Sequence, residues 1–236
     1  MYSYDRFLKI LLETEGIPNA LNNVLKYDFI YHSNKIERST FTIEAIQLLI
    51  EKKIVKGTHT LNDIQETINS YYTFDLVIDS LNEKLSLQMI KEWHERLMYR
   101  TRTYDLQLAG VFREFEKMRY GTNDIRVRIL NIEDKLISLI NDYYSLENVT
   151  IEDLARFHLK FKNIHPFQHG DGKIARFIFL KQLLENKLPL KYMNGDNSLF
   201  YKRSLNKFRN GNLETLVDYL NSQKDFIEEN KQLLER

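Results

Sequence analysis

The sequence predicts a mainly α-helical fold, and three features of its composition and pattern lead to that prediction. The 236 residues include eight Gly and three Pro, whereas average usage would give roughly 16 and roughly 12. Few residues that break helices or form tight turns favour long helices and little sheet. Hydrophobic residues make up 43% of the chain, which is enough to bury a core. Apolar residues also recur at three- and four-residue steps, as on the buried face of a helix.

Charge and cysteine content exclude several classes of protein. The 34 Lys+Arg and 33 Asp+Glu leave a net charge of +1, which argues against a broad nucleic-acid or membrane surface. The chain has no Cys, which excludes disulfide frameworks, thiolate metal sites and cysteine catalysis and fits a reducing cytosol. Charged side chains within residues 1–16 argue against a secretory signal, and the longest apolar run, Phe177–Leu180, is too short to span a bilayer. We expect a cytoplasmic protein without nucleic-acid or membrane partners.

The first hundred residues predict three helices. Thr42 is a plausible N-cap for Ile43–Val55, and Ser86 for Leu87–Met98. Between them, one stripe at helical spacing is expected to be the buried face of a long helix; it comprises Leu61, Ile64, Ile68, Tyr71, Tyr72 and Leu76. We place a boundary near residue 100, which separates an N-terminal helical region, 1–100, from a core of residues 101–225 and a helical tail, 226–236.

Residues 110–129 interrupt the helical pattern. Ile125, Val127 and Ile129 alternate with arginines, which is typical of a strand. The preceding Tyr120–Asp124 has turn chemistry, so we predict an exposed β-hairpin. The spacing of Val111–Met118 fits either a strand or a helical turn.

Helices resume after the predicted hairpin. Asn131 is a plausible N-cap for Ile132–Tyr144. Thr150 begins the next helix with a capping-box-like pattern. This helix should stop before Pro166, because a residue that precedes proline is disfavoured in the helical region.

The segment His165–Arg176 combines a helix end, a glycine-bearing loop and a new helix that begins near Gly172. Free backbone N–H groups at a helix N-terminus bind phosphate. Gly170 and Gly172 permit close backbone approach. Lys173 and Arg176 are three residues apart and therefore share a helix face. These features predict a cradle for more than one phosphate.

Two further residues of this segment supply chemistry. His165 can act as general base toward an incoming hydroxyl, and Asp171 can bind Mg²⁺, which prefers oxygen ligands. Together with the cradle they form a phosphoryl- or nucleotidyl-transfer site. Each residue taken alone is more often structural: a loop histidine, a Gly-Asp-Gly turn, or a solvated face that carries Lys173 and Arg176.

The segment resembles the signature of the Fic family (filamentation induced by cAMP), HPFx[D/E]GNGRxxR. Ala109–Arg113 is similar to the AGxxR segment at the start of that family's hairpin flap. Tyr201–Leu205 is similar to its YxxxL segment, and Ser33–Glu37 to its inhibitory [S/T]xxxE[G/N] motif. The resemblance implies a mainly helical Fic fold with a short β-hairpin flap. It also implies protein adenylyltransferase activity, in which AMP passes from ATP to a Ser, Thr or Tyr hydroxyl of a target protein or of the chain itself.

The resemblance assigns roles to residues outside the cradle. The flap, with Arg113, Ile125 and Val127, would dock the target by strand addition. Tyr201 would line the adenine pocket, although a core tyrosine is an equal alternative. The same resemblance implies Mg²⁺ or Mn²⁺ as cofactor and allows a homodimer through helical faces.

Three positions depart from the family signature. His169 stands where the family has its metal-binding Asp or Glu, and imidazole is a poor ligand for Mg²⁺. Asp171 replaces Asn, so the metal site is assigned to this carboxylate. Lys173 replaces Arg and offers a point charge instead of a two-pronged donor. His169 itself is most simply a polar loop residue, with a transition-metal ligand or a phosphate donor as alternatives.

The resemblance pairs Glu37 with Arg176, which would block productive binding of the γ-phosphate. The alternative for Ser33 and Glu37 is a surface ion pair or a helix-end charge. Arg38 stands where the family has Gly or Asn, so the helix end is expected to differ and inhibition to be partial. Two other functions remain open: transfer of another group (phosphate, UMP or GMP, phosphocholine) and non-catalytic nucleotide binding.

Overall fold

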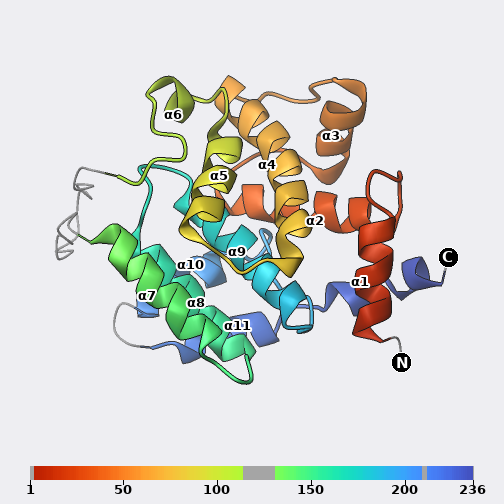
Figure 1. The fold of residues 1–236 in the computed structure, drawn as a ribbon. Coiled ribbons are helices and arrows are strands. Elements are labelled where there is room, and N and C mark those ends of the chain that lie inside the picture. The colour runs from red at the N-terminus through yellow and green to blue at the C-terminus, as the bar shows by residue number, and fades with distance from the viewer. Residues whose placement is uncertain (1–2, 114–130, 209–211, 236) are drawn as a thin grey trace.

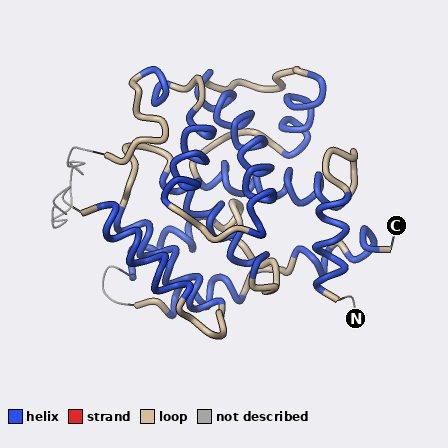
Figure 2. Tube along the Cα trace, in the orientation of Figure 1, coloured by secondary structure: helices blue, strands red, loops and turns tan. Residues whose placement is uncertain are grey.

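The computed structural model describes residues 3–113, 131–208 and 212–235, and in these ranges the chain is helical without a strand (Figures 1 and 2). The predicted helical class is therefore confirmed. The predicted hairpin, including Ile125 and Val127, lies outside the described residues.

The helices follow one another in a simple order along the chain. The first half contains α1 (Tyr4–Glu13), α2 (Leu21–Ile36), α3 (Ile43–Gln47), the π-helical η1 (Leu48–Lys52), α4 (Leu61–Asp79), the 3₁₀ turn η2 (Ser80–Asn82), α5 (Leu87–Met98) and α6 (Arg102–Asp105). The second half contains α7 (Ile132–Tyr144), α8 (Ile151–Ile164), α9 (Asp171–Glu185), α10 (Ser198–Phe208), α11 (Glu214–Asn221), α12 (Phe226–Glu229) and the 3₁₀ turn η3 (Lys231–Leu234). None of the described helices combines the length and apolar character needed to cross a membrane.

The predicted helix starts agree with the side-chain caps. Thr42, Ser86 and Thr150 each accept a hydrogen bond from the backbone N–H three residues later. At Thr150 the capping box is complete, because Asp153 accepts in return from the Thr150 backbone. Helix α8 ends at Ile164, two residues before Pro166, as predicted.

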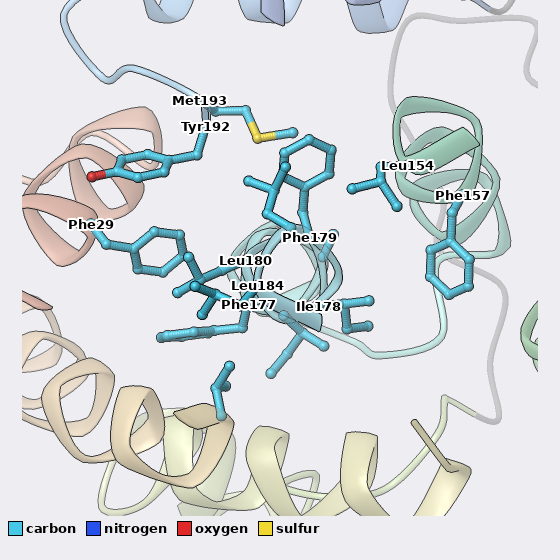
Figure 3. Packing of buried hydrophobic residues seen from close by; sticks show 14 of the residues in the cluster. Phe29, Leu154, Phe157, Phe177, Ile178, Phe179, Leu180, Leu184, Tyr192 and Met193 are labelled. Carbon is cyan, nitrogen blue, oxygen red and sulfur yellow. The ribbon is translucent and has the colours of Figure 1, made fainter. Parts of the chain in front are cut away.

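Helix α9 is the centre of the fold. Every residue from Asp171 to Leu184 is buried, as expected for a helix surrounded by others. It contacts α2, α4, α5 and α8, and its apolar side chains radiate toward Phe29, Leu154 and Tyr192 (Figure 3). The main core takes side chains from Phe7 through Leu234, so residues on both sides of position 100 share it.

The buried face of α4 differs from the prediction. Leu61 is 86% exposed, and Tyr72 and Leu76 are exposed as well. The face that is buried carries Asn69, Ser70 and Thr73 beside apolar residues. Hydrogen bonds satisfy these small polar groups. Asn69 Nδ2 donates to the carbonyls of Leu97, in the last turn of α5, and of Tyr99, just after it. Thr73 Oγ1 donates to the Asn69 carbonyl within α4. Ile64, Ile68 and Tyr71 of the predicted stripe are partly buried against a second apolar cluster, so apolar periodicity alone identified only part of the buried face.

Candidate functional site

The loop before α9 is shaped by two left-handed residues. His165 closes α8 with φ 54°, and its N–H donates to the Phe161 carbonyl at 3.1 Å. Gly170 precedes α9 with φ 82°. An added Cβ on Gly170 would lie 2.7 Å from the Met98 side chain, so this turn needs a glycine for both its dihedral and its close packing. The loop therefore carries His165 beside the N-terminus of α9.

Asp171 orients the predicted general base. Its Oδ2 pairs with Nδ1 of His165, and its Oδ1 accepts from the backbone N–H of Phe167 at 2.8 Å. The carboxylate thus ties the first residue of α9 back across the loop. Because Nδ1 faces Asp171, proton transfer with an incoming hydroxyl falls to Nε2.

His94, a buried histidine of α5 outside the motif, packs against the loop and bonds to its backbone. The His94 ring stacks on Phe167 with centroids 3.7 Å apart. Its Nε2 lies 3.0 Å from the His169 carbonyl, and the Gly110 N–H donates to its Nδ1 at 2.9 Å. These contacts assign the neutral Nε2–H tautomer, and burial accordingly lowers the pKa of His94 to about 4. Sequence reasoning missed this residue, which shows only as one polar position on an apolar helix face.

Arg113 bonds to the backbone of the loop. Its Nε donates to the His165 carbonyl at 2.6 Å, and its own N–H donates to the Pro166 carbonyl at 2.8 Å. The side chain is 9% exposed. In this structure Arg113 therefore braces the loop, and its predicted role in target docking stays a prediction.

Arg176 is the buried cation of the cradle. It is 1% exposed. Its Nε donates to Ser33 Oγ at 2.9 Å, and its Nη2 donates to the Ser33 carbonyl and to Glu37 Oε1 at 3.0 and 2.8 Å. Nη1 is buried and has no hydrogen-bond partner within the described ranges. It lies 3.3 Å from the place of a Cβ on Gly172, so an unsatisfied donor faces the first turn of α9.

Glu37 covers the same turn. A Cβ added to Gly172 would lie 2.3 Å from Glu37 Oε1, so the carboxylate occupies the space directly against the helix N-terminus. Burial acts to raise the pKa of Glu37, but Arg176, Lys162 and Lys173 outweigh it and hold this pKa at about 2. Lys162, in the last turn of α8, is a third cation near the cradle that the motif did not reveal.

The helix end at Glu37 closes in spite of Arg38. Arg38 adopts φ 73°, and the Ser39 N–H donates to the Asn34 carbonyl at 3.1 Å. The arginine therefore takes the left-handed conformation in which the family places Gly or Asn. With this helix end, Glu37 reaches Arg176.

Lys173 has a partner that the sequence did not suggest. Its ammonium is 2.7 Å from Glu66 Oε2 on α4. The Lys173 side chain is 4% exposed and that of Glu66 is 24% exposed. In this structure Lys173 is therefore nearly buried and paired with a carboxylate, and its predicted role as a phosphate ligand stays a prediction.

Tyr201 takes the core alternative. It is 1% exposed, and its hydroxyl lies 2.8 Å from Nε2 of His158. The other ring nitrogen of His158 lies 3.2 Å from the Ala175 carbonyl. Because a carbonyl only accepts, Nδ1 donates to it and Tyr201 donates to Nε2. Tyr201 thus supports α9 from behind Arg176, and no face of its ring is open to a base in this structure.

Comparison with known proteins agrees with this geometry. Residues 84–183 match the Fic/DOC family. The chain is 22% identical over 201 residues to the protein adenylyltransferase Fic of Nematostella vectensis, covering 82% of this chain and 46% of that protein. It is 23% identical over 198 residues to the protein adenylyltransferase fic-1 of Caenorhabditis elegans, covering 81% and 38%. The chain thus spans less than half the length of these relatives.

Solved structures of Fic proteins share the fold. A Fic domain containing signaling protein from Bacteroides thetaiotaomicron VPI-5482 superposes with a TM-score of 0.72 at 18% identity, over 99% of this chain and 93% of that chain. Fic-1 (residues 134–508) from C. elegans superposes with a TM-score of 0.70 at 19% identity, over 92% of this chain and 68% of that chain. The likeness extends beyond the matched Fic domain to the N-terminal helices.

The cradle draws on more than the matched Fic domain. The motif residues His165–Arg176 lie within residues 84–183, but Ser33, Glu37 and Glu66 precede this range. The two carboxylates that pair with Arg176 and Lys173 therefore both come from the N-terminal helices.

The contacts of Asp171 do not fit the metal-binding role predicted for it. One of its oxygens accepts from Phe167 and the other pairs with His165. Across the described part of the chain, no three His, Cys, Asp or Glu side chains gather as ligands for a metal ion. We therefore derive no step through a protein-bound metal at Asp171.

Proposed function

We propose that this chain is a protein adenylyltransferase that transfers AMP from ATP to a hydroxyl side chain of a target protein or of itself. The observation that carries the proposal is the His165–Asp171 pair at the N-terminus of a buried helix, beside the unsatisfied Nη1 of Arg176. The names of the relatives, protein adenylyltransferase Fic and fic-1, support the choice of ATP and of a protein acceptor.

The chain's own groups divide the work of this reaction. The unpaired N–H groups of the first turn of α9, at Asp171, Gly172 and Lys173, would hold phosphate oxygens of the donor. Arg176 would neutralise phosphate charge from below this turn. Asp171 would hold the His165 ring by Nδ1 with Nε2 toward the acceptor.

The chemical step is then a displacement at the α-phosphorus. Nε2 of His165 takes the proton of the acceptor hydroxyl as its oxygen forms a bond to the α-phosphorus. The bond between this phosphorus and the oxygen that bridges to the β-phosphate breaks, and pyrophosphate leaves with the electron pair. Most of the rate enhancement is expected from positioning and from charge stabilisation at the helix N-terminus.

We further propose that Glu37 inhibits the reaction in cis. Its carboxylate uses Nη2 of Arg176 and fills the space against Gly172 that a phosphate would enter. Two anions cannot share this space, so a nucleotide that binds productively must displace Glu37. The Glu37 side chain is 44% exposed, which leaves solvent on one side into which it can move.

Incubation with ATP labelled at the α-phosphate, in Mg²⁺ and in Mn²⁺, tests both proposals. We expect weak labelling of the parent chain, at least about 10-fold more in Glu37→Gly, and none in His165→Ala added to that variant. Glu37→Gln, of equal size but neutral, separates the charge from the bulk of the side chain. Glu152→Gln, on the exposed ion pair with Arg156, is the matched surface control.

The label position separates this function from its rivals. Transfer of a γ-label without an α-label would replace the proposal by phosphotransfer. Nucleotide binding with neither label, in all variants and with candidate protein acceptors present, would leave a binding module.

A further inference from the structure

Lys173 is one of the two cations that the motif places at the cradle, and it forms an ion pair with Glu66. Lys173 Nζ lies 2.7 Å from Glu66 Oε2, and Asn62 Nδ2 donates to Glu66 Oε1 at 2.9 Å. Both oxygens of the Glu66 carboxylate are therefore engaged. Lys173, at 4% exposed, has its charge neutralised in a partly desolvated place, where such a pair is stronger than on the surface.

The helix that carries Glu66 is fixed on two sides. Asn69, three residues on, donates to the carbonyls of Leu97 and Tyr99 at 3.0 and 2.6 Å. One residue after Glu66, Thr67 Oγ1 accepts from Asn34 of α2 at 3.2 Å. Helix α4 is thus bonded to α2 and to the end of α5, and it also contacts α9. These bonds fix the α4 backbone beside α9, and the Glu66 side chain, held by Lys173 and Asn62, is less exposed than that of Glu37.

A phosphate that reached for Lys173 would have to separate it from Glu66. The carboxylate would then face the phosphate across a few ångströms, and like charges at that distance repel. Withdrawal of Glu66 into solvent would break its bonds to Lys173 and Asn62 and leave a nearly buried ammonium without its carboxylate. The outer phosphate of a donor therefore gains little from Lys173 while Glu66 is present.

We propose that Glu66 is a specificity-determining residue that withholds Lys173 from the donor. The site then grips the donor through the α9 N–H groups and Arg176, and it distinguishes weakly between nucleotides with two and three phosphates. This inference rests on the proposed nucleotide-binding function of the same site, and it concerns how many phosphates of the donor the site recognises.

Competition binding measures this discrimination directly. The Glu37→Gly chain, whose cradle is open, is titrated with a fluorescent ribose-labelled ADP, which is then displaced by AMP, ADP or ATP with Mg²⁺. We expect the affinities for ATP and ADP to agree within about threefold. In Glu37→Gly/Glu66→Gln the released ammonium can bond to the outer phosphate, so the preference for ATP should rise at least about 10-fold.

Two matched variants complete the design. Glu66→Gln with Lys173→Gln removes the pair and should return the ATP-to-ADP ratio to that of Glu37→Gly. Glu92→Gln, which changes an exposed Glu–Gln contact on α5 in the same way, should leave the ratio unchanged. If Glu66→Gln alone does not fold, the pair-deleted variant still decides: a 10-fold loss of ATP preference there shows that Lys173 was already binding phosphate.

The possible outcomes distinguish failure of this inference from failure of the proposed function. Nucleotide binding with a large ATP preference already in Glu37→Gly, or with no change on Glu66→Gln, overturns this inference and leaves the proposed function standing. Absence of binding of every nucleotide to every variant overturns both.

Discussion

Acidification should destabilise this protein through His158, a buried histidine that must stay neutral. Its Nδ1 donates to the Ala175 carbonyl and its Nε2 accepts from Tyr201. Burial, followed by the charges of Lys162 and Arg176, lowers the pKa of His158 from 6.5 to about 3. Between these values the unfolded chain binds a proton that the folded chain does not. The free energy of unfolding therefore falls as the pH falls through this window.

The size of the effect follows from the width of the window. Each pH unit well below 6.5 contributes about 1.4 kcal/mol, so acidification from pH 6.5 to 4.5 lowers the free energy of unfolding by about 2 kcal/mol. His158→Gln keeps one donor and one acceptor but removes the titration. We expect this variant to lose about 1 kcal/mol at pH 7, and to become relatively more stable than the parent by about 2–3 kcal/mol on going to pH 4.5.

Urea unfolding at pH 7, 5.5 and 4.5 measures the difference. The single tryptophan, Trp93, is 2% exposed and reports unfolding by fluorescence. His94 and Glu37, whose pKa values are also lowered, are present in both proteins and cancel in the comparison. His169→Gln, at an exposed loop side chain, is the control. Parallel stability curves for the parent and His158→Gln would refute the reasoning.

Three substitutions around the cradle give further predictions. Gly170→Ala should lower the free energy of unfolding by about 1–3 kcal/mol in urea, because its φ of 82° and the Met98 contact both oppose a Cβ; an unchanged midpoint would contradict this. Gly172→Ala, added to Glu37→Gly, should weaken nucleotide binding at least about 10-fold in a fluorescence titration, since the methyl group fills the space where phosphate enters; full affinity would mean that phosphate binds elsewhere. Tyr201→Phe should cost about 1 kcal/mol of stability through its lost hydrogen bond, and a neutral result would argue against the bond.

The sequence predicted helix boundaries well where a local interaction sets them. Thr42, Ser86 and Thr150 cap helices because their side chains reach backbone groups three residues away. Pro166 fixes the end of α8 for a similarly local reason. The motif predicted that α9 begins at the loop, and the observed start at Asp171 differs by one residue.

Prediction from the sequence failed for features that depend on contacts between residues far apart in the chain. The buried face of α4 is partly polar because Asn69 and Ser70 bond to groups on α5 and α2, and apolar periodicity does not report such bonds. The roles of Lys173 and Arg113 also depend on their partners, Glu66 and the His165 carbonyl, which lie 107 and 52 positions away. The motif gave the chemical character of these residues, but only the tertiary contacts show which of their charges and donors remain available.

The two carboxylates at the cradle should respond differently to a nucleotide, because they differ in exposure and in the bonds that hold them. Glu37 ends a helix, is 44% exposed and shares Arg176 with Ser33. Glu66 lies within a helix bonded on two sides, is 24% exposed and is also held by Asn62. An incoming phosphate can replace the Glu37 carboxylate as the anion that binds Arg176. The released carboxylate is then hydrated, because Glu37 is partly exposed. The same exchange at Lys173 would leave the negative charge of Glu66 close to the phosphates, without its cationic partner. The N-terminal helices therefore supply one carboxylate suited to leave and one suited to stay, and this asymmetry predicts inhibition from the first and phosphate selectivity from the second.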